Sequence, residues 1–507
     1  MDRLIKYGLI FLGLLLILVA FASLGWRFQH DSPILLYIAF LIERFGCVPY
    51  RDIFDMNMPG MYLAYWIIGR FSGYTASGVR FADLLILSGM LAMTWLWMRR
   101  LGSRTAWCGC ILWGLMYLAA GPMTSLQREY LLLLPVAAGL FAHSALETHR
   151  LRQAVVGLLF GVAATMKPQA AIGFPLLLLF DLRGGLQPGD PGLREPLRRV
   201  ALPAILGFGL PVSCVLVYLW LAGTLASFVD IVVRYLPLYG SLSGWHETLS
   251  GVRRAWYLVE NYRTLGGFGL WIAPAAVGTY FALCGSSLSD GSKRQVRLLL
   301  GLAALYSVYP VFSGQFWPYH WLPFLYFLMQ LASLCLVAQP MSASRSARLF
   351  PPLVFALAMA AALPLHPVRD ALAGSAALPL GGRVDEMAAF LKQNLSPGDT
   401  VQPLDWTGGA VHAMLTSEAR IATPFIYDFH FYHHVSTDYI QGLRRRFLAD
   451  MARARPRFIL NVFGNDKPWV WGADTTRDFY ELQLILSAGY RVVLSGNGYT
   501  IHQRIAE

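Results

Sequence analysis

Long apolar runs alternate with short polar segments over roughly the first 365 residues of this 507-residue chain. Many windows of about 20 residues carry no charge, and this is the length that an α-helix needs to cross a bilayer. The first run follows Arg3 and Lys6, and it is too long for a secretory signal and has no clear small-residue cleavage site. We therefore expect a polytopic membrane bundle of about eleven helices, the first of them retained in the membrane. The expected spans are 7–26, 77–98, 105–121, 129–147, 153–166, 169–182, 200–222, 264–284, 298–312, 320–338 and 349–365.

Basic residues are concentrated in every second connection between these runs. With the N-terminus in the cytoplasm every internal connection is basic, which is the positive-inside pattern. The residues concerned are Arg99, Arg100, Arg104, Arg150, Arg152, Arg183, Arg194, Arg198, Arg199, Lys293, Arg294, Arg297, Arg345 and Arg348. The pattern predicts a multi-pass protein of the inner (plasma) membrane, with loops 27–76, 122–128, 223–263 and 313–319 outside the cytoplasm. These connections explain the formal net charge of +12, so we expect no nucleic-acid partner.

The pattern changes near Pro367, where continuous apolar runs give way to short periodic segments. Helical periodicity covers 383–395, 436–455 and 475–488, and Ser436 or Thr437 is a suitable N-cap for the second of these. Strands are predicted at 400–404 and 456–463, followed by a hairpin that turns at Gly496-Asn497-Gly498. We therefore expect two parts, a transmembrane module at 1–366 and a small extracytoplasmic α/β domain at 367–507.

The segment from Arg27 to Met61 carries charge directly after the first span. Apolar residues recur at helical spacing between Pro33 and Phe45, which indicates an amphipathic helix lying on the membrane surface. A short, acidic, turn-rich stretch follows, GCVPYRDIFDMNMPG. An acid outside the first span, then about 15 helical residues, then this stretch, resembles the first external loop of GT-C glycosyltransferases. The similarity is to the branch of protein O-mannosyltransferases and aminoarabinose transferases. It implies a GT-C fold and transfer of a sugar from a polyprenyl-phosphate carrier, and we expect inversion at the sugar carbon.

Two acids stand where that family places its catalytic carboxylates. Asp31 matches the family's aspartate and would take the acceptor proton as general base; Asp-Ser-Pro is also a good helix start, so Asp31 is equally an N-cap candidate. Glu129 begins the fourth span and would orient the acceptor or the base, although a carboxylate at a helix N-terminus is favourable in any protein. Both interpretations stay open for each acid.

Several residues are candidates for the donor and its carrier phosphate. Arg128 and Lys167 supply positive charge; Lys167 lies between two short apolar segments, where a charge is costly and usually functional, unless it only snorkels to the interface. Asn57 stands where the family often has a lysine that contacts the carrier phosphate. Tyr319 and His320 match a family Tyr-His pair, but an aromatic belt explains them equally well.

The remaining polar candidates are assigned to support or left open. Arg51, Asp52 and Asp55 are expected to support the loop, with Arg51 pairing one of the two acids, and a direct role for Asp52 and Asp55 stays open beside this interpretation. His430, His433 and His434 are expected to pack among aromatic rings rather than to bind metal, and the six cysteines show no disulfide or zinc spacing. We expect no cofactor; a divalent ion on Asp31, Asp55 and Glu129 is conceivable but not required.

The sequence thus predicts a membrane glycosyltransferase that uses a polyprenyl-phosphate sugar on the extracytoplasmic face. Its partners would be that donor, membrane lipids, and a glycan, lipid or protein acceptor. Two alternatives remain: a polytopic lipid or sugar transporter or flippase, and an oligosaccharide ligase or polymerase that uses a lipid-linked donor. Acids that cluster outside the bilayer midplane and the absence of a visible inverted repeat favour the transferase over the transporter.

Overall fold

The structure is a computed structural model that describes residues 2–185, 197–340, 342–362, 378–464 and 467–505. The chain divides into two compact units. Unit 1 comprises residues 1–25, 80–215 and 259–375, and unit 2 comprises 26–79, 216–258 and 376–507. The sequence boundary expected near 366 falls among residues 363–377, outside the described part of the chain.

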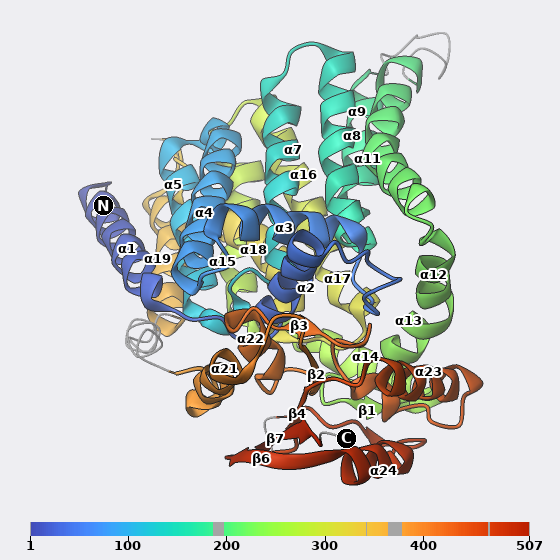
Figure 1. The fold of residues 1–507 in the computed structure, drawn as a ribbon. Coiled ribbons are helices and arrows are strands. Elements are labelled where there is room, and N and C mark those ends of the chain that lie inside the picture. The colour runs from blue at the N-terminus through green and yellow to red at the C-terminus, as the bar shows by residue number, and fades with distance from the viewer. Residues whose placement is uncertain (1, 186–196, 341, 363–377, 465–466, 506–507) are drawn as a thin grey trace. The chain divides into compact units, whose positions relative to one another are not determined.

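Unit 1 is a bundle of helices, several of them long and apolar (Figure 1). Its helices, wholly or mostly within the unit, are α1 Asp2–Ala22, α4 Ala76–Met98, α5 Ser103–Ala119, α6 Arg128–Leu131, α7 Leu133–Ala145, α8 His149–Met166, α9 Phe174–Gly185, α11 Leu202–Leu221, α15 Ile272–Tyr280, α16 Asp290–Ser307, α17 Tyr309–Ser313, α18 Leu322–Ser333 and α19 Arg345–Ala362. Short 3-10 turns join several of them, including η2 Arg99–Leu101, η4 Pro168–Gly173 and η10 Pro318–Trp321.

Each expected span overlaps one of these helices or a pair of them, although 264–284 contains only α15 between short turns, and the end of the last span lies outside the described residues. Within the described chain, five helical segments are long and apolar enough to cross a membrane, and a sixth candidate is a pair bent by 65°. The remaining spans correspond to shorter or less apolar helices. The five segments are Arg3–Gly25, Ala76–Leu101, Leu197–Leu221, Asp290–Ser313 and Pro318–Leu336, and the bent pair is Gly251–Gly267 with Gly269–Gly285. The predicted polytopic bundle is confirmed.

The centre of unit 1 is α18, whose residues are all buried. It packs against α5, α15 and α16, so its apolar side chains face protein on every side. A helix that is apolar all round is stable only when it is enclosed in this way or lies in a membrane. The helices nearer the edge of the bundle, such as α1 and α11, expose large apolar side chains instead.

Helices α8 and α11 approach so closely that only glycine fits at their crossing. A Cβ on Gly157 of α8 would lie 2.0 Å from the carbonyl oxygen of Ala204, and one on Gly207 of α11 would lie 2.1 Å from that of Ala154. Small residues at such crossings let two backbones come together, which is a common packing mode of membrane helices.

Unit 2 combines helices with a five-stranded mixed sheet. Strands β3 Arg420–Ile421, β2 Thr400–Leu404, β4 Phe458–Val462, β7 Tyr499–Arg504 and β6 Tyr490–Gly496 lie in that order. Strand β2 is parallel to both of its neighbours, and β7 is antiparallel to both of its own. Two further strands, β1 Glu247–Thr248 and β5 Trp471–Gly472, form a small parallel pair. The helices of this unit are α2 Ser32–Phe45, α3 Pro59–Ser72, α12 Leu225–Asp230, α13 Leu236–Gly240, α14 Gly251–Arg263, which extends into unit 1, α21 Arg383–Asn394, α22 Ala410–Thr416, α23 Asp438–Ala454 and α24 Tyr480–Gly489.

The predicted elements of the C-terminal region are largely confirmed. Strand β2, helices α21 and α23 and the β6–β7 hairpin lie where the sequence puts them, and Thr437 is the N-cap whose hydroxyl accepts from the amide of Ile440. Helix α24 begins at Tyr480 rather than near 475, since the preceding residues form a turn in which Thr476 accepts from the amide of Asp478. Helix α22 and helix α3 were not predicted.

Helix α2 exists as predicted, but the expectation that it lies on the membrane surface is wrong. Residues 34–41 are each 5% exposed or less, so no face of this stretch is left for lipid. Within unit 2 the helix packs on α3 and α22, and the Tyr37 hydroxyl donates to the carbonyl of Ala419 at 2.7 Å. Helical spacing alone does not distinguish a helix covered by protein from one covered by headgroups.

Candidate functional site

Glu129 lies at the start of the bundle helix α6 and is fully buried. Lys167 follows the last residue of α8, where an extended backbone (φ −153°) ends that helix. The Lys167 ammonium donates to Oε1 of Glu129, and the Lys167 side chain is 16% exposed. Among the described residues, Oε2 of Glu129 is buried without a hydrogen-bond partner. A buried carboxylate is tolerable only when it is paired, so this contact holds the two segments together.

Three more predicted residues surround this ion pair. Nε2 of His320 lies 3.6 Å from the same Glu129 oxygen, and the His320 ring packs edge-on against Tyr319 with centroids 4.8 Å apart. The Arg128 guanidinium lies 5.9 Å from the centre of the Tyr319 ring. Unit 1 therefore brings together Arg128, Glu129, Lys167, Tyr319 and His320 from three separate segments of the chain.

This cluster contains two permanent cations and one carboxylate in a buried setting. An ammonium group has three N–H donors and a guanidinium five, so each cation can donate to more than one partner. A buried site of this composition favours an incoming anion, because charge–charge interactions strengthen as water is excluded. The Tyr309 hydroxyl, which is buried with no hydrogen-bond partner among the described residues, lies within electrostatic range of Glu129 and adds a donor.

A buried polar network that was not predicted from the sequence supports the segment before Glu129. Arg80 and Asp83 in α4 form a buried ion pair, and the Tyr117 hydroxyl donates to Oδ1 of Asp83 at 2.8 Å. Tyr117 in turn accepts from the amide of Leu126 at 3.1 Å, and Tyr130 donates to the carbonyl of Asp83. Two opposite charges three residues apart inside an apolar span were the signal that could have revealed it.

Leu126 itself has a left-handed backbone, with φ of 56°. This conformation is rare for residues other than glycine and costs of order 1 kcal/mol or more. The hydrogen bond from its amide to Tyr117 helps to keep this turn in place. This turn lies two residues before Arg128, with which α6 begins.

Unit 2 contains the other predicted acids, beginning with Asp31. Asp31 occupies the N-cap position of α2, but its carboxylate makes no capping hydrogen bond to that helix. Instead Oδ1 lies 3.1 Å from Nδ1 of His30, and Asp31 is only 8% exposed. Burial lowers the pKa of the neighbouring His246 to about 4, with His30 lowering it further and Asp31 opposing the shift. Asp31 is thus a buried carboxylate beside two imidazoles, and its side chain does not cap α2.

The residues of the YRDIFD turn have structural partners in the same unit. Asp55 is fully buried and accepts from the hydroxyls of Tyr62 and Tyr427 and from the side-chain amide of Asn57. The Asn57 amide is therefore directed at Asp55. Arg51 pairs with Asp52 at 2.9 Å on the surface, and this contact lowers the pKa of Asp52. The predicted pairing of Arg51 with one of the two acids is confirmed.

The histidines of the DFHFYHH stretch lie among aromatic rings. The Tyr235 hydroxyl is in contact with Nδ1 of His430 and lies 3.4 Å from Nε2 of His433. Both histidines are completely buried, and burial lowers their pKa, that of His433 to about 3. Among the described residues no group of three or more His, Cys, Asp or Glu side chains is placed to hold a metal ion.

The site residues predicted from sequence therefore fall into two sets. Arg128, Glu129, Lys167, Tyr319 and His320 form the cluster in unit 1, and Asp31, Arg51, Asp52, Asp55 and Asn57 belong to unit 2. Their roles in catalysis or binding remain predictions.

Comparison with known proteins identifies the fold. No family model matches the sequence, and no curated protein matches it either. Two solved structures of ArnT from Cupriavidus metallidurans, bound to undecaprenyl phosphate and in the apo state, are similar with TM-scores of 0.56 and 0.59. Each shares 13% sequence identity and covers 99% of this chain and 98% of ArnT. The archaeal oligosaccharyltransferase AglB from Archaeoglobus fulgidus is less similar, with a TM-score of 0.47, 12% identity and coverage of 90% of this chain and 69% of that one. The predicted GT-C fold is confirmed, and ArnT is a solved structure with a similar fold.

Proposed function

We propose that this protein is an integral membrane glycosyltransferase that moves a sugar from a polyprenyl-phosphate carrier to an acceptor outside the cytoplasm. In the reaction the bond between the sugar carbon and the carrier phosphate breaks. A bond from that carbon to the acceptor oxygen or nitrogen forms on the opposite face, with inversion. The acceptor loses one proton to a base, and the carrier phosphate leaves with the electron pair.

The observation that carries the proposal is the buried cluster of Glu129, Lys167, Arg128 and His320 in a chain with the fold of ArnT. ArnT was crystallised with undecaprenyl phosphate, so this fold accommodates a lipid phosphate. Charge on a departing phosphate must be neutralised as it develops, which requires cations fixed in place beforehand. Lys167 and Arg128 have that charge and are held by Glu129 and Tyr319.

In this mechanism Glu129 is a positioning residue for Lys167. The Lys167 ammonium donates to Oε1 of Glu129, and an ammonium group has three N–H donors, so it can serve carrier phosphate oxygens as well. His320 is close enough to the same carboxylate to interact with its charge. The Tyr319 ring packs against His320 and lines the cluster. Asn57 donates to Asp55, which directs its amide group toward that carboxylate in this structure.

Asp31 is the proposed general base. It is a carboxylate with little exposure to water, and it has a histidine at 3.1 Å to share a proton with. The acceptor proton goes to Asp31 as the acceptor atom attacks the sugar carbon, which is the chemistry that inverting transfer to a hydroxyl or amine needs. No divalent metal is invoked, so transfer should persist in a chelator.

The location and acceptor belong to the same proposal. The proposal puts the N-terminus in the cytoplasm and the loops that carry Asp31 and Glu129 on the other face of the inner membrane, and the basic connections support this orientation. The proposed acceptor is a glycan, a lipid or a protein. The C-terminal α/β region is proposed to shape the acceptor entrance rather than to take part in the chemistry.

The test is Asp31→Asn in the full-length protein reconstituted into liposomes. The assay supplies a panel of undecaprenyl-phosphate pentoses and hexoses with envelope extract as acceptor, and measures release of free undecaprenyl phosphate. A general base contributes roughly 10²- to 10⁴-fold, so the variant should lose at least about 100-fold in kcat while carrier binding stays within about threefold.

Asp52→Asn is the matched control, because it removes a carboxylate from the same loop whose partner is a surface arginine. It should keep wild-type transfer. Full activity of Asp31→Asn would overturn the base assignment. Movement of the intact sugar carrier across the bilayer, without release of undecaprenyl phosphate, would establish the transporter alternative instead.

A further inference from the structure

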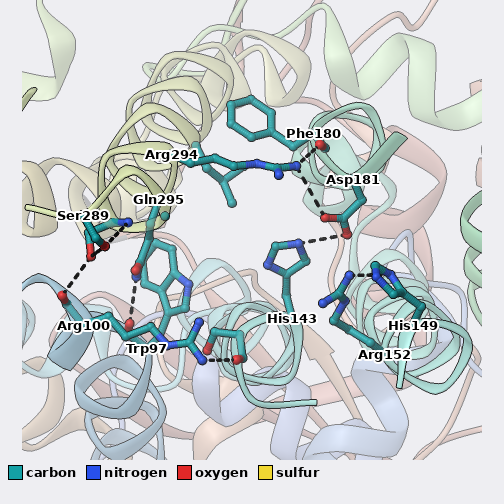
Figure 2. Close-up of a pocket in the computed structure, with 14 residues that line it drawn as sticks. Trp97, Arg100, His143, His149, Arg152, Phe180, Asp181, Ser289, Arg294 and Gln295 are labelled. Carbon is teal, nitrogen blue, oxygen red and sulfur yellow. Dashed lines mark hydrogen bonds and ion pairs between the residues drawn. The ribbon is translucent and has the colours of Figure 1, made fainter. Parts of the chain in front are cut away.

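A pocket of about 630 Å³ opens at one end of the helices of unit 1 (Figure 2). It is lined where α4 and α7 end, where α8 begins, near the end of α9, and at the start of α16. Its volume is within the range of small-molecule sites, which is roughly 300–1,000 Å³. Trp97, Phe180 and Leu298 supply apolar surface, and the rest of the lining is mainly polar.

The pocket is separate from the Glu129 cluster. It meets the first turn of α8, whereas Lys167 follows the last turn of the same helix. Helix α8 has 18 residues, and at about 1.5 Å per residue its ends are about 27 Å apart. Nothing in the proposed transfer reaction uses this end of the bundle.

The charged lining is mainly cationic. Three arginines, Arg100, Arg152 and Arg294, contribute guanidinium groups against one carboxylate, that of Asp181. Asp181 is already engaged, since Nε2 of His143 lies 3.0 Å from its Oδ2 and Arg294 lies 3.9 Å from its Oδ1. Figure 2 shows Arg294 and His143 converging on Asp181 from different helices. The local balance therefore favours an anion.

The arginines also retain donors. Arg100 donates to the carbonyl of Ser144 at 2.5 Å, Arg294 donates to that of Phe180, and Arg152 is 2.8 Å from Nδ1 of His149. Arg100 and Arg294 each use one N–H donor in these hydrogen bonds to backbone carbonyls near helix ends. A guanidinium has five N–H groups in a planar fork that fits phosphate oxygens, so several remain.

The start of α16 adds to the same field. Ser289 is its N-cap and Ser292 lies in its first turn, and both line the pocket. The N-terminus of a long helix carries partial positive charge and exposed amide groups, which favour an anion that the arginines already attract.

We propose that this pocket binds a phosphate ester, with the phosphate held by Arg152 and Arg294 and the organic part against Trp97 and Phe180. Two sources share this chemistry, a soluble phosphate monoester and the headgroup of an anionic lipid. Such a site would let a phosphate ester bound at this end of the bundle influence the transfer reaction that we propose at the other end.

The test measures binding by the purified full-length protein. Equilibrium dialysis with radiolabelled glycerol 3-phosphate probes the soluble source. Nanodiscs that mix phosphatidylglycerol with phosphatidylcholine, followed by native mass spectrometry of retained lipid, probe the membrane source. The variants are Arg152→Gln and Arg294→Gln, with Arg294→Lys to keep the charge. The matched control is Arg150→Gln, because Arg150 is exposed on the same turn of α8 and does not line the pocket.

Loss of a charge-assisted hydrogen bond should weaken binding roughly tenfold or more. The proposal is supported when either probe binds the wild type, is lost in both Gln variants, and is unaffected in Arg150→Gln; the probe that binds identifies the source. Arg294 is 45% exposed, so its variants should fold even if Arg152→Gln does not, which melting temperatures will show. Absence of binding by both probes, or equal losses in Arg150→Gln and Arg294→Gln, would overturn the proposal.

Discussion

Two fully buried carboxylates of this chain differ in what surrounds them. Asp55 accepts from two tyrosine hydroxyls and an amide, all neutral donors. Glu129 is paired with the Lys167 ammonium, and its other carboxylate oxygen is buried and lacks a hydrogen-bond partner among the described residues. A carboxylate with several neutral donors needs no counter-ion nearby, whereas one with a single cation depends on it. The first arrangement stabilises a loop, and the second is open to an additional ligand.

Replacing Lys167 by methionine should therefore destabilise unit 1. The change leaves the Glu129 charge buried without its partner, which typically costs about 3–5 kcal/mol. The double variant Glu129→Gln, Lys167→Met should recover most of this stability, because no unpaired charge remains. Melting in detergent measures the stability. Transfer of sugar should stay lost in both variants, because the double variant also lacks the cation. A double variant as active as the wild type would contradict the role of Lys167 at the phosphate.

Asp55→Asn should destabilise unit 2 by about 1–3 kcal/mol. An amide nitrogen placed against Tyr62 and Tyr427 cannot accept from both hydroxyls, so at least one buried donor loses its partner. Hydrogen exchange of the strands in unit 2 reports the loss. Asp52→Asn is the comparison, because its pair with Arg51 is exposed to solvent and such pairs contribute little. Equal effects of the two changes would mean that the hydrogen bonds of Asp55 carry no special weight.

Helices of the bundle differ in how their faces are used. Helix α18 is enclosed on all sides, whereas α11 presents glycine to α8 on one face and large apolar side chains on another. The α8–α11 crossing is set by backbone contact, so its geometry cannot relax without moving a helix. Since Lys167 follows α8 directly, the crossing also fixes where that ammonium lies.

Gly207→Val should disrupt this crossing. Its Cβ would lie 2.1 Å from a backbone carbonyl oxygen, which a flexible side chain cannot relieve, so we expect a loss of at least about 1–3 kcal/mol of stability. Gly209→Val, two residues further along α11, is the control, since nothing lies within 4 Å of a Cβ built there. Thermal unfolding in the same detergent compares them. An equal loss of thermal stability in Gly209→Val and Gly207→Val would instead indicate a general loss of helix propensity or backbone adaptation.

Unit 2 is assembled from three stretches that are far apart in the chain. Arg27 pairs with Asp385 at 2.7 Å, and the amide of Phe54 donates to the carbonyl of Pro424 at 2.8 Å. Helix α2 supplies apolar surface that α22 covers. The first external loop and the C-terminal region therefore stabilise one another, and either one without the other would expose much of its core.

Acid should weaken this unit. Burial lowers the pKa of His412 and of His433 to about 3, and that of His246 to about 4. The folded state thus binds fewer protons than the unfolded chain, in which histidine titrates near 6.5. The stabilisation is present above pH 6.5 and is lost as the pH falls from 6.5 towards these lower values. At pH 4.5 each of His412 and His433 should cost about 2–3 kcal/mol.

Unfolding followed by hydrogen exchange between pH 7 and pH 4.5 tests this linkage. His412→Leu keeps a buried apolar side chain beside Phe28 and removes one titrating group, so it should flatten the pH dependence by about one proton. The wild-type slope persisting in His412→Leu would show that other groups cause the acid sensitivity.

The sequence by itself determined the elements whose signal is local. The apolar spans follow from length and hydropathy, because crossing a bilayer demands a run of about 20 apolar residues wherever it occurs. The β2 strand, the β6–β7 hairpin and the Thr437 cap follow from alternation and turn chemistry within a few residues.

Only the tertiary structure decided which of these elements meet. Glu129 and its ammonium partner are 38 residues apart, and Asp55 and Tyr427 are 372 apart, so no short pattern announces either contact. The same holds for the burial of α2, whose helical spacing fits a membrane surface as well as a protein core, and for the pocket of Figure 2, which needs the ends of several helices. The type of a charged residue limits which groups it can bind. Its actual partner depends on which distant segments pack together, because a buried charge without a partner is too costly.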